Sequence, residues 1–176
     1  MDAIALLRQQ LALAHNVVEV TMADVTQEQA DWTPPGVANP LGATYAHSVF
    51  AEDMVVGGMF RQQAPLFAGE WAGRLGMSEP MPTLDRWQDY QGWARSVRVD
   101  LPALRQYAQA VYAATDDYLA SLSPEDLDRT IDMSSAGMGE MSWGQALSLL
   151  VVGHVNNMAG EISVLKGVQG ARGYPF

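Results

Sequence analysis

The three histidines of the chain are the residues whose type and placement point most directly to chemistry. His15, His47 and His154 each fall on or beside the apolar stripe of a different expected helix. A single histidine on such a stripe is more often a packed side chain whose ring nitrogens are satisfied locally. Three together favour a site, because facing helices build metal and cofactor sites and histidine is the commonest metal ligand among side chains.

A catalytic metal at this place needs about three protein ligands and an open position for water or substrate. Residues four apart share a helix face, so the expected partner of His154 is position 158. That position holds Met158, whose thioether is a soft donor suited to Cu(I) and poor for zinc, nickel or manganese. His15 and Glu161 are the candidates for a further ligand. The alternative for Glu161 is a solvated charge near the end of its helix.

Amphipathic periodicity predicts the helices that position these residues. Apolar residues recur at helical spacing over residues 3 to 22, 40 to 60, 101 to 122 and 142 to 167. No segment has the alternation of a convincing strand. We therefore expect one all-α domain over residues 1 to 176, built as a bundle of four principal helices.

Local signals place the connections between these helices. Capping boxes predict helix starts at Thr26 and at Ser142. Residues 61 to 81 lack a clear period and are expected to form a long irregular connection, after which a further helical region begins near Thr83. A flexible loop is expected around Gly137.

Composition excludes several classes of protein. The 176-residue chain has 10 basic and 20 acidic residues, and its net charge of −10 argues against nucleic acid or an anionic membrane as a partner. With no cysteine there is no disulfide, thiolate nucleophile or Cys-ligated metal, which fits a reducing cytoplasm. We find neither a signal peptide nor an apolar run of about 20 residues, so we expect a cytoplasmic protein without a membrane span. The apolar share of 48% and charged share of 17% favour large internal or intersubunit contacts.

Motifs of other enzyme classes are missing from the sequence. Ser134 lies outside a nucleophile-elbow pattern, and no glycine-rich phosphate loop follows a strand. The acid pairs Glu52-Asp53 and Asp116-Asp117 are expected on solvated faces, because neighbouring helical residues point about 100° apart. The tryptophans are interpreted as core or interface anchors.

Two segments resemble the DinB-like superfamily. The run Asp31-Trp32-Thr33-Pro34-Pro35-Gly36, followed by residues 39 to 47, resembles the segment that leads into the second helix of DinB-like proteins. Residues 154 to 162 resemble the late signature of that superfamily, H-x-x-x-H-x-G-Q-I. The resemblance covers residues 3 to 167 and implies a four-helix bundle with up-down-down-up topology.

The resemblance also implies a divalent metal, nickel or zinc, held by one histidine of the second helix and two of the last. By position, His47 and His154 correspond to two of these ligands. Met158 stands where the family has its third histidine, and Glu161 replaces the usual glutamine. Related families include bacillithiol- and mycothiol-dependent transferases and mycothiol-dependent maleylpyruvate isomerase, whose metal activates the thiol of a low-molecular-weight cofactor. DinB-like proteins are commonly homodimers.

Two functions of different classes follow from these observations. The first is a divalent-metal-dependent enzyme of the thiol transferase or hydrolase type, with His47 and His154 as metal ligands, His15 or Glu161 as the third, and water as the fourth. The second is a metal-free protein that binds a small molecule in an apolar cavity lined by Met158. A purely structural homodimer is the third alternative.

Overall fold

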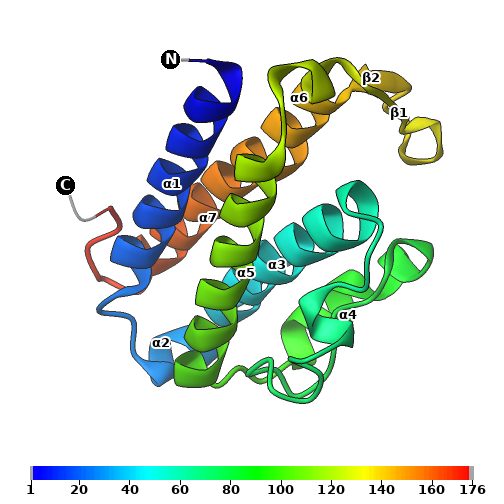
Figure 1. Cartoon of the computed structure of the whole chain (residues 1–176). Helices are drawn as coiled ribbons and strands as arrows, with labels where there is room; N and C mark the ends of the chain where they lie inside the picture. Colours follow the sequence, from blue (N-terminus) through cyan, green and yellow to red (C-terminus); the bar gives the residue numbers. More distant parts are fainter. Residues whose placement is uncertain (1, 175–176) are drawn as a thin grey trace.

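The long helices of the protein pack against one another in pairs. The computed structural model describes residues 2–174. In it, α1 (Ala3–Met22) contacts α5 (Leu101–Ser121) and α7 (His154–Gly167), and α3 (Leu41–Asp53) contacts the same two helices. Figure 1 shows α1 beside α7, with α5 crossing in front of α3. The chain is mostly helical, as the periodicity predicts, and the up-down-down-up order stays a prediction.

Shorter elements connect and flank these helices. They are α2 (Gln27–Asp31), a π-helical segment (Met54–Phe60), 3₁₀ turns (Leu66–Ala68 and Leu84–Asp89), α4 (Tyr90–Ser96), a 3₁₀ turn (Pro124–Asp128), β1 (Thr130–Asp132), a 3₁₀ turn (Ser134–Ala136), β2 (Glu140–Ser142), α6 (Trp143–Leu147) and a second π-helical segment (Ser148–Gly153).

Helix starts follow the local signals in the sequence. The capping boxes predicted at Thr26 and Ser142 are confirmed: each hydroxyl accepts a hydrogen bond of 3.2 Å from the backbone N–H three residues later. The side-chain oxygens of Gln29 and Gln145 accept in return from the backbone N–H of the capping residue, at 3.0 Å. These bonds satisfy N–H groups that a helix start would otherwise leave unpaired.

Two predicted helices are not α-helical throughout. The second begins at Leu41, with Pro40 as its N-cap, and becomes π-helical after Asp53. The last carries a π-helical segment that ends directly before His154. The expectation of continuous α-helices is therefore wrong at these places. A π turn takes up one extra residue, which a stripe of apolar residues does not reveal.

The expectation of no strands is also wrong, although the loop around Gly137 is confirmed. β1 and β2 form an antiparallel pair in which Ile131 lies opposite Met141. Each strand has three residues, too few to display an alternating pattern. The connecting loop turns through Gly137 and Gly139, at positive φ angles of 75° and 69° that favour glycine.

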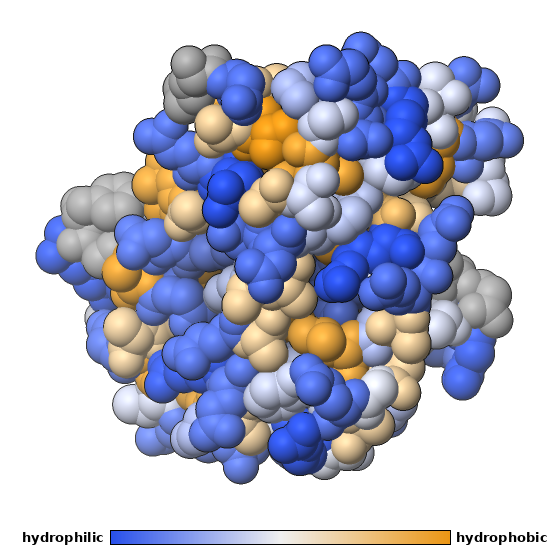
Figure 2. All heavy atoms as spheres, viewed as in Figure 1, coloured by the Kyte–Doolittle hydropathy of each residue, from blue (hydrophilic) through white to orange (hydrophobic). Residues whose placement is uncertain are grey.

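Buried apolar side chains from all the long helices form one cluster. Every residue of α3 is buried, so this helix runs through the interior and its polar side chains are enclosed with it. On the face in Figure 2, hydrophilic residues predominate, and the most prominent apolar patch lies near the upper ends of α1 and α5. Within residues 2–174, no helix has both the length and the apolar character needed to cross a bilayer.

Candidate functional site

The centre of the site is a pair of histidines from two neighbouring helices. His47 lies in the middle of α3, and His154 is the first residue of α7. Their Nε2 atoms are 2.9 Å apart and their rings lie at 28° to each other, so one imidazole donates a hydrogen bond to the other. The sequence expectation that these two side chains meet is fulfilled in the interior between α3 and α7.

The other ring nitrogen of each histidine lacks a partner. Both Nδ1 atoms are buried and make no hydrogen bond. Burial lowers the pKa of His47 to about 3, with a smaller contribution from the neighbouring His154. Burial also lowers the pKa of His154, while the carboxylate of Glu52 acts in the opposite direction. Both imidazoles are therefore neutral at pH 7, and of the two unpartnered Nδ1 atoms one carries a proton and the other a free lone pair.

Two aromatic side chains pack against His47. The rings of Tyr90 and Trp87 meet His47 edge-on, with centroids 4.9 and 5.8 Å from the imidazole. They also stack on each other, with centroids 4.5 Å apart. Trp87 is 43% exposed, so it is not a core anchor, and its alternative role as an interface anchor stays a prediction. This aromatic cover separates His47 from solvent.

The third histidine belongs to a separate polar cluster. His15 Nε2 lies 2.8 Å from Oε2 of Glu52, and its imidazole stacks on the ring of Tyr112 at 3.7 Å. The hydroxyls of Tyr112 and Tyr45 both donate to the same oxygen of Glu19, at 3.1 and 2.8 Å. His15 thus has its own carboxylate partner and does not join the histidine pair.

The expectation that Glu52 and Asp53 lie on a solvated face is wrong. They are only 1% and 4% exposed. Residues 41 to 56 hold no other charge, and a helix that is apolar all round is buried, so this signal could have placed both carboxylates inside. By contrast, Asp116 is exposed, as expected, and pairs with Arg8 at 2.7 Å.

The two buried carboxylates have different surroundings. Asp53 accepts hydrogen bonds from the backbone of Leu66 and Phe67, both at 2.9 Å, and from the Tyr107 hydroxyl at 2.7 Å. It anchors the connection after the π-helical segment and has no spare oxygen. Glu52 binds His15 through Oε2, keeps Oε1 buried and without a partner, and acts on His154 through its charge. Glu52 is therefore a site residue that the sequence interpretation missed.

The remaining ligand candidates lie on α7. Met158 is partly buried, one turn after His154, while Glu161 is exposed. Partial desolvation raises the pKa of Glu161, whose charge acts on Tyr90. Among the described residues, no group of three His, Cys, Asp or Glu side chains could hold one metal ion. Neither His15 nor Glu161 therefore completes a set with the histidine pair.

These residues do not fit the nickel or zinc centre that the resemblance implies. Such a centre needs about three nitrogen, oxygen or thiolate ligands, and the pair supplies two nitrogens. Metal-bound histidines also almost always donate their second N–H to an acceptor, whereas neither Nδ1 has one here. We derive no catalytic step through a divalent metal.

A cavity of about 580 Å³ lies beside α3, one helical turn from His47 along the chain. Its lining includes neither His47, His154 nor Met158, so it is not the cavity lined by Met158 that the sequence suggested. Phe50, three residues after His47, lines it, as does Trp93, whose ring centroid is 5.7 Å from that of Tyr90. Phe67, stacked on Phe50 at 4.2 Å, and Met81 complete its apolar wall.

The charged groups on the rim of this cavity are engaged. Arg86 pairs with Asp89 at 2.8 Å. Glu79 accepts a hydrogen bond of 3.0 Å from Ser96, and its backbone oxygen accepts one of 3.2 Å from the Trp93 indole. The rim therefore carries one ion pair, Arg86–Asp89, and one carboxylate, Glu79, that is held by a neutral hydroxyl donor.

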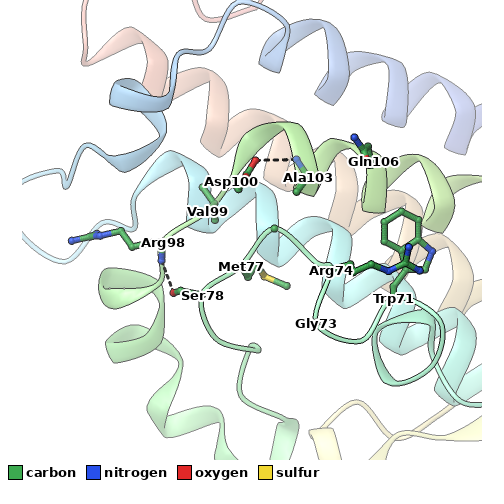
Figure 3. Close-up of a pocket in the computed structure, with 11 residues that line it drawn as sticks. Trp71, Gly73, Arg74, Met77, Ser78, Arg98, Val99, Asp100, Ala103 and Gln106 are labelled. Atoms are coloured by element: carbon green, nitrogen blue, oxygen red, sulfur yellow. Dashed lines mark hydrogen bonds between the residues drawn. The ribbon is translucent and has the colours of Figure 1, made fainter.

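A second cavity of about 610 Å³ lies elsewhere, between the 71–78 loop and the start of α5 (Figure 3). The Arg74 guanidinium lies over the Trp71 ring at 5.0 Å. Asp100 caps α5 through a bond of 3.1 Å to Ala103, and Arg98 extends away from Trp71 and Arg74 in Figure 3. Its charged groups do not converge, so this cavity is a weaker candidate.

Comparison with known proteins agrees with the fold. The sequence profile of the DinB superfamily matches residues 10–159. The solved structure of a conserved protein from Enterococcus faecalis is similar, with a TM-score of 0.81 over 97% of this chain and 99% of that one, at 22% sequence identity. No curated protein sequence matches the chain. Because the superfamily match spans most of the chain, from before His15 to beyond Met158, the protein belongs to the DinB superfamily.

Proposed function

We propose that this DinB superfamily member is a small-molecule-binding protein that takes an uncharged, largely apolar ligand in the cavity beside His47. The observation that carries the proposal is a cavity of about 580 Å³ with aromatic walls, one turn from the histidine pair. Ligand pockets have this size and are mostly apolar with a few placed polar groups. The Arg86–Asp89 ion pair and the Glu79 carboxylate on the rim disfavour an anionic ligand, because Arg86 is already paired and the carboxylates would repel an anion.

Binding of N-phenyl-1-naphthylamine, a neutral fluorescent probe, tests this proposal. We expect saturable binding, weakened roughly tenfold or more by Ser96→Trp, since the indole fills the cavity mouth and tenfold corresponds to about 1.4 kcal/mol. Gln109→Trp, at an exposed position of α5, is the matched control and should bind as wild type does. Absence of saturable binding, or equal affinity in Ser96→Trp, refutes the proposal.

A divalent-metal enzyme of the thiol transferase or hydrolase type is the second candidate. The observation in its favour is the 2.9 Å approach of two imidazole nitrogens from different helices. Elemental analysis of untagged protein, before and after addition of nickel, zinc and manganese, decides between the two. We expect the protein to retain less than one equivalent of each metal per chain. Retention of one equivalent of metal by the wild type, and its loss in His47→Ala, would support the enzyme instead.

We further propose that the protein is a cytoplasmic homodimer. Leu6, Leu13 and Val20 are 43%, 64% and 36% exposed and recur every seven residues along α1. Residues spaced by seven share one side of a helix, so these three form an apolar stripe on its outer face. A second copy of the chain would bury this stripe in an isologous interface.

A further inference from the structure

A further cavity, of about 520 Å³, lies between the end of the π-helical segment Met54–Phe60, the end of α5 and the start of α6. Tyr118 and Ser121 line it from α5, and Trp143 lines it from α6. Among the described residues, it shares no lining side chain with the cavity beside His47, and neither histidine of the pair reaches it. Its volume is in the range of small-molecule sites.

Two arginines bring positive charge to one side chain of this cavity. Arg61 directly follows the π-helical segment, and Arg129 directly follows the 3₁₀ turn Pro124–Asp128. Both line the cavity. Burial raises the pKa of Tyr118, and the charges of Arg129 and Arg61 each act in the opposite direction. Two cations from separate segments therefore converge on one tyrosine.

The donors at this cavity lack acceptors. Within residues 2–174, no ion pair or hydrogen bond engages the Arg61 guanidinium. Arg129 Nη1 lies 3.6 Å from Asp126 Oδ1, farther than a normal hydrogen bond. The Tyr118 hydroxyl is buried without a partner among the described residues. Because buried polar groups in folded proteins are nearly always hydrogen-bonded, these donors point to an acceptor supplied by a ligand.

The charge balance of the lining indicates how many negative charges that ligand carries. Asp126 is the lining carboxylate, and its Oδ2 accepts hydrogen bonds from the backbone N–H and the hydroxyl of Ser123, at 2.9 and 3.0 Å. These bonds lower the pKa of Asp126, so it is ionised at pH 7. Two arginines and one carboxylate leave one positive charge uncompensated among the described lining residues. A monoanion balances this charge.

The rest of the lining offers an apolar wall. Phe60 meets the Trp143 ring edge-on, with centroids 5.3 Å apart, and Leu122 lies in the same wall. The Arg129 guanidinium lies over the Trp143 ring at 3.8 Å. A cation held on an aromatic face loses little freedom when it binds an anion, because it is already positioned.

The backbone at the cavity is strained. Gln62 has a φ angle of 52°, which residues other than glycine rarely adopt. The turn is closed on either side, because the Arg61 N–H donates to the Val56 oxygen at 2.9 Å and the Gln63 N–H donates to the Gly57 oxygen at 3.0 Å. Such strain concentrates at functional sites. Here it fixes the segment that carries Arg61.

We propose that this cavity binds a small organic acid through its single carboxylate group. Arg61 and Arg129 are the charged donors, since the guanidinium fork matches carboxylate geometry, and the Tyr118 hydroxyl is a neutral donor. Both arginines are exposed, so their side chains can rotate to bring the carboxylate to the buried hydroxyl. The apolar body of the ligand lies against Leu122 and Trp143. The site does not depend on the proposed binding of a neutral ligand beside His47.

Isothermal titration calorimetry with 2-naphthoate tests the site. We expect saturable binding, weakened roughly tenfold or more in Arg61→Gln, because a hydrogen-bonded charge pair is lost. Arg61 has no partner within residues 2–174, so this variant should fold as the wild type does. Arg172→Gln makes the same change of charge at an exposed position near the end of the chain, and it should leave the affinity unchanged.

Tyr118→Phe separates a binding role from a structural one. Removal of an unsatisfied buried hydroxyl should leave thermal stability equal or higher, while it weakens 2-naphthoate binding roughly 3- to 10-fold. The uncharged 2-naphthamide should be insensitive to Arg61→Gln, since it lacks the carboxylate.

Three outcomes would overturn the proposal. They are the absence of saturable 2-naphthoate binding, equal affinity in the wild type and Arg61→Gln, and tighter binding of 2-naphthyl phosphate than of 2-naphthoate, which would indicate a dianion site. Ser96→Trp, which fills the cavity beside His47, should leave 2-naphthoate binding unchanged. The two binding proposals therefore fail separately.

Discussion

At the scale of single residues, the His47–His154 pair is an energetically unfavourable arrangement for the folded protein. A neutral imidazole carries one N–H, so the histidine that accepts at Nε2 holds its proton on Nδ1. Both Nδ1 atoms are buried without partners, which leaves one donor unsatisfied at a cost of about 1–3 kcal/mol. Side chains that only packed the core would avoid this cost. The pair therefore has the property expected of a functional site.

The low pKa of His47 predicts a loss of stability in acid. With a folded pKa of about 3 against an ordinary value near 6.5, the unfolded chain binds more protons between these two pH values. The contribution of His47 is therefore complete above about pH 6.5 and decreases as the pH falls toward 3. Urea unfolding without added metal should give roughly 1 to 2 kcal/mol less stability at pH 5 than at pH 7 from this group.

The matched variant for this measurement is His47→Gln, which can still hydrogen-bond to His154 but cannot be protonated. It should lose visibly less stability than the wild type over the same pH interval. If both proteins lost the same unfolding free energy between pH 7 and pH 5, His47 would not be the cause of the loss of stability in acid.

The His15–Glu52 pair gives a second prediction at this scale. His15→Ala leaves a buried carboxylate without its only hydrogen-bond partner among the described residues, and should cost about 3 kcal/mol of unfolding free energy. The double variant His15→Phe with Glu52→Leu replaces both polar side chains by apolar ones and should recover at least half of that loss. Chemical denaturation of the three proteins checks this. A double variant as unstable as His15→Ala would contradict it.

At the scale of elements, α3 positions the site because it lies close to its neighbours on all sides. A Cβ at Gly42 would meet Val99 Cγ2 at 2.5 Å and the Ala30 carbonyl oxygen at 3.0 Å. The glycine therefore permits the close approach of α2 and the 97–100 segment to the start of α3. This contact helps fix the direction in which α3 carries His47 toward α7.

Two glycine-to-alanine substitutions separate the effect of steric crowding on stability from the effect of helix propensity. Gly42→Ala should destabilise the protein by about 1–3 kcal/mol, because the overpacked methyl group outweighs the gain in propensity. Gly92→Ala, in α4, should stabilise by about 0.5–1 kcal/mol, because a methyl group there would meet nothing within 4 Å. Thermal unfolding of both variants gives the signs. If Gly42→Ala instead stabilised the protein, α3 would be shown to accommodate the added methyl group without a loss of unfolding free energy.

Much of this architecture could be predicted from the sequence, for identifiable reasons. The 3.6-residue period located the helices around His15, His47 and His154, and capping chemistry located Thr26 and Ser142. The π-helical segments could not be predicted, since one extra residue per turn barely disturbs an apolar stripe. The convergence of His47 with His154 was expected, while the separation of His15 depends on helix rotation, which periodicity defines only to within about a residue.

At the scale of the whole molecule, the net charge of −10 opposes self-association, whereas the outer stripe of α1 favours it. α1 has Arg8 and Glu19 as its charged residues, so its outer face is poor in charge compared with the chain. Two copies that meet along α1 would keep most of their negative charges apart. Screening of the residual repulsion should strengthen the proposed dimer.

Sedimentation at different ionic strengths tests this arrangement. The dimer fraction should rise between about 0.05 M and about 0.5 M salt, because the Debye length shortens from roughly 14 Å to 4 Å over this range. Leu13→Lys should shift the protein to monomer, whereas Ser121→Lys, on the exposed end of α5, should not. A protein that stays monomeric at every salt concentration would exclude the dimer. A dimer that persists in Leu13→Lys would show that the interface does not include the outer stripe of α1.

The π-helical segment Ser148–Gly153 ends at the residue on which the candidate site depends. A π turn corresponds to a single-residue insertion in an α-helix, and each helical residue turns the face by about 100°. Because the wide turn absorbs its extra residue locally, loss of one residue from this segment would restore a plain helix and leave His154 facing His47. This segment can therefore gain or lose one residue without turning His154 away from His47, whereas the same change within α7 would turn every residue after it by about 100°.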